Sequence, residues 1–162
     1  MNFKPIPNKF EHLNWQEIES VAKNKRSTVI WPFGAVEQHG PHLPLATDSI
    51  FVDEIISEVF KLFPPDIPLK KLPTQYIGFS PEHKGFAGTI SLSSNLITSM
   101  IKEVGSQLSE MGFKRLILIN GHGGQISLLN TAARELRSFS PGMAVFPCFL
   151  WSGVNGLSEL LT

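Results

Sequence analysis

Several features that would assign a chain to a particular class of protein are scarce or missing in this sequence. A single cysteine among 162 residues excludes an intrachain disulfide framework and fits a reducing compartment. Basic and acidic residues number 14 each, so no net charge favours nucleic acid or an anionic membrane. No uncharged apolar run approaches the roughly 20 residues of a membrane span, and the first residues lack the apolar region of a secretory signal. We therefore expect a soluble, cytoplasmic protein that binds neither nucleic acid nor membrane.

What the sequence does contain is enough apolar material for one folded domain. Apolar residues make up 42% of the chain, which is ordinary for a globular protein and too high for disorder. A domain of this length buries roughly 70% of the surface of its unfolded chain. Cys148 lies in the apolar stretch 145–149, and we predict a buried strand residue there in preference to a nucleophile.

Apolar periodicity predicts that helices and strands alternate along the chain. The predicted helices span 14–25, 49–63, 93–111 and 125–138, and the predicted strands span 27–33, 69–75, 89–92, 115–119 and 143–150. The near-continuous apolar run 115–119 is typical of a strand buried on both faces. The long loop 76–88 is of the kind that is more often functional than idle. Alternation of this kind predicts an α/β fold with a largely parallel sheet covered by helices on both faces.

Ligand-type side chains are concentrated directly after the first predicted strand, in residues 34–48. Glu37 and His39 are two apart, a spacing that points both side chains to the same side of an extended segment. Imidazole and carboxylate are groups that divalent metals bind, although a solvated surface loop is the alternative. His42 is close in sequence, and either orients a ligand from behind or is simply solvated.

Asp48 immediately precedes the helix predicted from Ser49, and two interpretations of it remain open. As an N-cap, it would accept backbone N–H bonds and complement the helix dipole. As a metal ligand, it would bridge two ions, and Thr47 or Ser49 would then take over the capping role.

A second cluster, residues 120–125, follows another predicted strand and contains His122. Gly121, Gly123 and Gly124 surround it and allow positive φ and close backbone approach. A phosphate-binding nest is one interpretation of such a turn, but the pattern matches neither common phosphate-loop motif. Since ligands bind beyond the carboxyl ends of parallel strands, both clusters are expected at one sheet edge. Metal coordination by His122 is therefore favoured.

Taken together, these motifs resemble those of the creatininase (creatinine amidohydrolase) family. The segment 34–48 is similar to the family's first metal motif, and residues 120–124, Asn-Gly-His-Gly-Gly, are similar to its second. Between them, residues 80–89 resemble the middle motif, with Ala87 where proline is more usual. The resemblance implies a three-layer α/β/α sandwich and a dinuclear centre of zinc, manganese or iron. The ligands it implies are Glu37, His39, Asp48 and His122, with Asp48 bridging.

Two departures from the family pattern accompany this resemblance. Creatininase itself has a glutamate at the position of Gly124, so the chain resembles the wider Asn-Gly-His-Gly-Gly subfamily and creatinine is disfavoured as substrate. Relatives with two glycines take a ligand from a C-terminal motif, and nothing like it occurs before Thr162, where the late acid Glu159 has an unrelated context. We therefore expect residues 1–162 to form a single creatininase-like domain lacking the family's C-terminal part.

The function that the resemblance implies is hydrolysis of a non-peptide C–N bond, in a cyclic or linear amide, by a metal-activated water. Glu82 and His83 are the candidate catalytic residues and Ser80 the candidate substrate contact. The expected partners are a small-molecule amide and further copies of the chain in a homo-oligomer. The alternative is a truncated, non-catalytic subunit or scaffold with an incomplete metal site.

Overall fold

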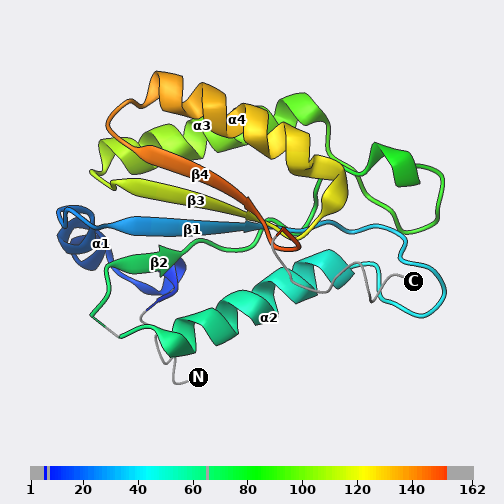
Figure 1. Cartoon of the computed structure of the whole chain (residues 1–162), viewed down its shortest axis with the longest axis horizontal. Helices are drawn as coiled ribbons and strands as arrows, with labels where there is room; N and C mark the ends of the chain where they lie inside the picture. The colour runs from blue at the N-terminus through cyan, green and yellow to red at the C-terminus, as the bar shows by residue number, and fades with distance from the viewer. Residues whose placement is uncertain (1–5, 7, 65, 153–162) are drawn as a thin grey trace.

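A computed structural model describes residues 6, 8–64 and 66–152 of the chain. Its centre is a four-stranded sheet in the order β2-β1-β3-β4, in which every neighbouring pair is parallel (Figure 1). The strands are β1 (Thr28–Phe33), β2 (Leu69–Lys71), β3 (Arg115–Asn120) and β4 (Ala144–Phe149). The predicted parallel α/β architecture is therefore confirmed.

Helices cover both faces of this sheet and complete three layers. The α-helices are α1 (Trp15–Ala22), α2 (Thr47–Leu62), α3 (Ser94–Glu110) and α4 (Ile126–Phe139). Three 3-10 turns accompany them: η1 (Phe10–His12), η2 (Pro81–His83) and η3 (Gly123–Gln125). Helices α3 and α4 lie side by side on one face, α2 lies on the other, and α1 packs near the start of β1 (Figure 1). None of the described helices combines the length and the hydropathy of a membrane span.

Local sequence explains where these helices begin and end. Asn14 caps α1 by accepting from the backbone N–H of Glu17, whose side chain accepts from the Asn14 N–H in return. Ser93 caps α3 by accepting from the N–H of Leu96. Gly112 follows α3 with φ +104°, a conformation that favours glycine.

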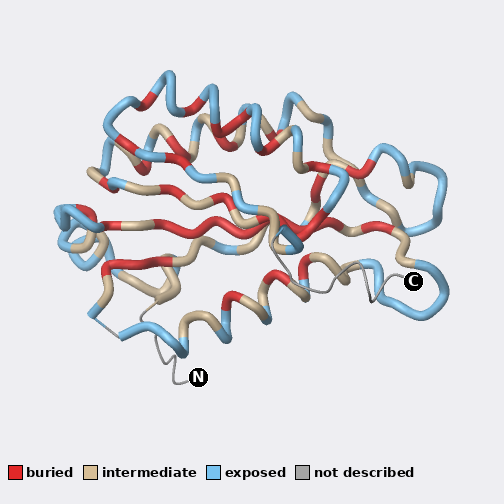
Figure 2. Tube along the Cα trace, in the orientation of Figure 1, coloured by how far each residue is buried: buried red, intermediate tan, exposed pale blue. Residues whose placement is uncertain are grey.

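The larger hydrophobic core lies between the sheet and the α3–α4 layer. Val29, Trp31 and Phe33 of β1 point into it, while Ile30 points into the smaller core under α2. The alternation follows the two-residue period of a strand and keeps all of β1 after Thr28 buried (Figure 2).

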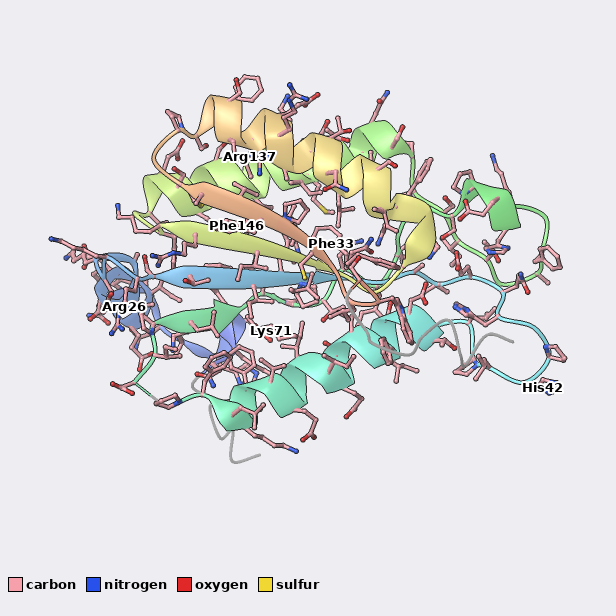
Figure 3. All side chains as sticks on the ribbon, viewed as in Figure 1. Arg26, Phe33, His42, Lys71, Arg137 and Phe146 are labelled. Carbon is pink, nitrogen blue, oxygen red and sulfur yellow. The ribbon has the colours of Figure 1, made fainter. Side chains whose placement is uncertain are left out.

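Two burial expectations for β3 and β4 are wrong, for one physical reason. β3 is half-buried at alternate positions, and Cys148 in the edge strand β4 is exposed. Phe146, on the same face as Cys148, is 50% exposed (Figure 3). Among the described residues the α2 layer packs mainly against β1 and β2, so this face of β3 and β4 is only partly covered.

Two predicted strands are shorter than expected. β2 ends at Lys71, and the rest of the predicted strand 69–75 contributes one isolated bridge between Gln75 and Phe33. The predicted strand 89–92 is not a strand but an isolated antiparallel bridge between Ile90 and Val36. Both segments run past the carboxyl end of β1, where the loop hydrogen bonds replace a regular ladder.

Candidate metal centre

The first ligand-type cluster begins where β1 ends and the chain packs closely against the start of α2. A Cβ on Gly34 would lie 2.5 Å from the Cα of Ser49, so only glycine fits this approach. Beyond it, the Glu37 backbone N–H donates to the Leu45 carbonyl at 2.9 Å. Glu37 is only 4% exposed, which is unusual for a carboxylate that lacks a full set of partners.

Asp48 lies in the first turn of α2 and does not cap it. The N-cap is Ala46, which offers no side-chain hydrogen bond, so the capping interpretation is wrong for Asp48 and for its neighbours Thr47 and Ser49. The two oxygens of Asp48 instead face two imidazoles: Oδ1 lies 3.2 Å from Nε2 of His39, and Oδ2 lies 2.8 Å from Nδ1 of His122. One carboxylate thus joins the two sequence clusters.

Backbone carbonyls set the orientation of both imidazoles. Nδ1 of His39 is 3.1 Å from the Glu37 carbonyl, which leaves Nε2 facing Asp48. Nε2 of His122 is 3.1 Å from the Phe79 carbonyl, which leaves Nδ1 facing Asp48 and the Oε1 atom of Glu37 at 3.2 Å. A histidine anchored through one nitrogen in this way presents the other as a lone pair to a metal.

The electrostatics of His122 reflect these acidic neighbours. Burial opposes the charged imidazolium, but the hydrogen bond with Asp48 and the charges of Glu37 and Asp48 outweigh it and raise the pKa of His122 above its ordinary value. Negative charge is therefore in excess around this ring, and a bound cation would offset it.

The glycine-rich turn around His122 works by close approach and not by positive φ. Gly121, Gly123 and Gly124 all lack positive φ, so that part of the expectation is wrong. A Cβ on Gly121 would lie 2.8 Å from the Asp48 carbonyl oxygen, so the turn packs directly against the start of α2. This packing brings His122 to Asp48, 74 residues away in sequence.

A cation fits the residues that surround Glu37. Its Oε2 atom is buried and has no hydrogen-bond partner among the described residues, a cost of about 1–3 kcal/mol or more for a charged group. Ligand atoms within 4.8 Å of one another are offered by two groups that share Glu37: Glu37 with His39 and Asp48, and Glu37 with Glu82 and His83. Carboxylate and imidazole together suit zinc, manganese and iron, so the donor set and the orphaned oxygen agree.

The middle loop brings its three predicted site residues to the same place. Ser80 is fully buried, and its hydroxyl lies 3.3 Å from Nε2 of His122. Glu82 and His83 form the turn η2, with Glu82 Oε1 3.7 Å from His122 Nε2 and His83 Nε2 3.8 Å from Glu37 Oε1. These three residues and the four expected metal ligands therefore converge at one edge of the sheet.

His42 does not join this group. It is exposed at the tip of the loop between Gly40 and α2, well away from the strand ends (Figure 3). It forms no hydrogen bond within the described part of the chain.

The Gln125 side chain, which no sequence motif singles out, joins the loops of the site by hydrogen bonds. It is fully buried; its Oε1 accepts from the Phe79 N–H at 3.2 Å, and its Nε2 donates to the Gly34 carbonyl and to Asn120 Oδ1, each at 3.1 Å. A glutamine at the start of a predicted helix is only a weak indication of a buried structural role, because glutamine at such a position is usually exposed to solvent.

Several known proteins are similar to this chain in sequence. A family model described as Creatininase, creatinine amidohydrolase, matches residues 11–161. A mycofactocin precursor peptide peptidase from Mycobacterium tuberculosis is 35% identical over 127 residues, covering 75% of this chain and 50% of the relative. A creatinine amidohydrolase from Pseudomonas putida is 28% identical over 134 residues, covering 77% and 50%. The chain thus spans about half the length of these curated relatives.

Solved structures agree on the fold. A manganese creatininase superposes with a TM-score of 0.79 at 24% identity, covering 97% of this chain and 63% of the other. A creatininase variant of Zn–Zn type gives a TM-score of 0.80 at 24% identity, covering 98% and 63%. At this identity the likeness establishes the three-layer architecture alone.

Proposed function

The chain belongs to the creatininase family, and from that premise we propose that it is a metal-dependent amidohydrolase that cleaves a C–N bond with water. The single observation that carries the proposal is the buried, partly unpartnered carboxylate of Glu37 at the meeting point of three imidazoles and two further carboxylates. Structural cores seldom bury such a group without a cation.

We propose Glu37, His39, Asp48 and His122 as the ligands of a divalent centre. Asp48 is the proposed bridge, since its two oxygens face different imidazoles. Two ions per complete site, of zinc, manganese or iron, fit these donors, and structural neighbours are named for manganese and for zinc. When bound, such ions polarise a carbonyl oxygen and lower the pKa of a coordinated water.

His83 is the proposed proton donor. The Gln38 side-chain oxygen accepts from the Gly40 N–H at 3.0 Å, so the Gln38 amide NH₂ donates to His83 Nδ1, also at 3.0 Å. A neutral His83 therefore carries its proton on Nε2, 3.8 Å from Glu37 Oε1 and facing the cluster. From there it can donate to the nitrogen that leaves when the C–N bond breaks.

Glu82 and Ser80 flank this position. The Glu82 side chain is 44% exposed, so it lies on the solvent-accessible side of the cluster, where it can contact substrate or move a proton. Ser80 is buried against His122, and its role as a direct substrate contact stays a prediction.

The substrate class proposed is a small-molecule amide. Its restriction to non-peptide bonds stays a prediction, because one relative is named a precursor peptide peptidase and another a creatinine amidohydrolase. We further propose cytoplasmic location and a homo-oligomeric state, in which the exposed face of β4 around Phe146 meets a second copy.

A second candidate function is a non-catalytic subunit with an incomplete metal site. Within the described part of the chain β4 is an edge strand with a partly covered face, and such an edge is suited to contacts with another chain. Under this alternative the protein binds fewer metal ions and hydrolyses no amide.

Hydrolysis separates the two candidates. The metal-loaded full chain, offered a panel of cyclic and linear amides, is expected to release amine or ammonia, and His122→Ala is expected to abolish the release. His42→Ala, an exposed histidine outside the cluster, is the matched control and should keep full activity. Absence of turnover on the whole panel, in protein that binds metal, would favour the non-catalytic subunit.

A further inference from the structure

Glu82 occupies space that a side chain at position 124 would otherwise fill. A Cβ built on Gly124 would lie 2.1 Å from Oε1 of Glu82 and 2.5 Å from Nε2 of His122. The backbone of Gly124 does not have positive φ, so its conformation alone does not require glycine. Because glycine has no side chain, there is space beside His122, and the Glu82 carboxylate from the middle loop occupies it.

The turn that carries Glu82 is held firmly against the centre. The Ser80 N–H donates to Ser91 Oγ at 2.8 Å, and the His83 N–H donates to the Ser80 carbonyl at 3.2 Å. Just before the turn, the Phe79 N–H is held by Gln125 and its carbonyl by His122. The backbone is therefore fixed while the Glu82 side chain, 44% exposed, keeps freedom to turn.

The surroundings of Glu82 are those of a ligand more than of an ion-pair partner. Its ligand atom and that of Glu37 lie within 4.8 Å of each other in a group completed by His83. Two carboxylates this close repel unless a cation lies between them, and Glu37 Oε2 is buried without a hydrogen-bond partner among the described residues. With the Gln38 amide donating to its Nδ1, a neutral His83 carries its proton on Nε2 and presents no lone pair to a metal in this space.

We propose that Glu82 is itself a metal ligand, supplying from the middle loop the carboxylate that Gly124 cannot supply. The inference rests on the proposed function, since it assigns one more donor to the same centre. It leaves proton donation to His83 and gives Glu82 a coordinating role in place of proton transfer. It also implies that the centre can hold its second ion with residues of this chain.

Metal stoichiometry and affinity test the assignment without any measurement of activity. The full chain of each variant would be stripped with chelator and titrated with Zn²⁺ by calorimetry, with elemental analysis after gel filtration. Glu82→Gln is expected to lower the count from about two ions per chain to about one, or to weaken the second site at least tenfold. Glu54→Gln, an exposed glutamate of α2, is the matched control and should bind as the wild type does.

A coordination signature separates a ligand from a residue that only shapes the site. Glu82→Cys loaded with Co²⁺ is expected to show a thiolate-to-cobalt charge-transfer band, because a coordinating cysteine binds as its thiolate. Glu54→Cys in the same background, which retains the exposed Cys148, should show none. Wild-type stoichiometry and affinity in Glu82→Gln, with no band in Glu82→Cys, would overturn the assignment while leaving the proposed function intact. A wild-type chain that takes up no metal would overturn both.

Discussion

Replacing Gln125 by leucine removes the polar tie between the site's loops while nearly preserving side-chain volume. In the wild type, Gln125 holds the Gly34 carbonyl, the Phe79 N–H and the Asn120 side chain. Asn120 Oδ1 keeps a second donor, the His122 N–H at 3.0 Å. The other two groups lose the only hydrogen-bond partner they have within the described part of the chain.

The loss of stability follows from the two buried polar groups that are left without a hydrogen-bond partner. Each buried polar group left unsatisfied costs about 1–3 kcal/mol, so Gln125→Leu is expected to lower the free energy of unfolding by about 2–6 kcal/mol. At about 2–4 °C per kcal/mol for a chain of this size, the melting temperature is expected to fall by at least about 4 °C. The metal affinity should fall about tenfold as well, because the loops that orient His122 lose their support.

Calorimetric melting of the metal-free protein measures the first effect, and Zn²⁺ titration measures the second. Gln107→Leu, an exposed glutamine on α3, is the matched control, with an expected change within about 0.5 kcal/mol. Equal melting temperatures for Gln125→Leu and Gln107→Leu would show that the loops do not depend on the Gln125 side chain.

Three further outcomes follow from the structure. Gly34→Ala forces a methyl group against the backbone of Ser49 and should lower the free energy of unfolding by about 1–3 kcal/mol. Urea unfolding measures this change, and an unchanged midpoint would contradict the close approach of Gly34 to Ser49. Burial alone would raise the pKa of Asp53. A hydrogen bond with Lys71, which is also a 2.8 Å ion pair, and two further hydrogen bonds lower the pKa instead. Because the folded-state pKa lies below the unfolded value of about 3.9, this stabilisation is present above that value and is lost as pH falls through the folded pKa. Asp53→Asn should therefore lower stability by about 1–3 kcal/mol at pH 7 and lose less on acidification, which unfolding at pH 7 and pH 3 would test. Phe146→Ser should weaken self-association with a stability change within about 0.5 kcal/mol, and an unchanged sedimentation profile would exclude this face as the contact.

Local periodicity was enough to predict most of the fold. The helix boundaries of α2, α3 and α4 fall within two or three residues of those predicted, because each helix buries one apolar stripe. The parallel sheet followed from the alternation of elements. Exposure of Phe146 and Cys148 could not be predicted, because an apolar strand looks the same whether or not a neighbouring layer covers it.

The sequence was enough to predict that the two ligand-type clusters lie close together, but it did not predict the contacts that join them. Strand ends on one sheet edge brought Asp48 and His122 together as expected. The proximity of Glu82 to Gly124 depends on how the middle loop folds back, and no periodic pattern encodes that path. The capping interpretation of Asp48 was wrong because residues 44–46 make the helix start without it.

Glu37, His39, Asp48 and His122 are proposed to bind metal, and the metal content of the purified full chain measures whether they do. Elemental analysis after saturation with Zn²⁺ or Mn²⁺ and gel filtration is expected to give about two ions per chain. Glu37→Gln and His122→Ala should each lower that number, while His42→Ala should not. A wild-type chain that remains metal-free and shows no uptake on titration would exclude a metal centre formed by these residues.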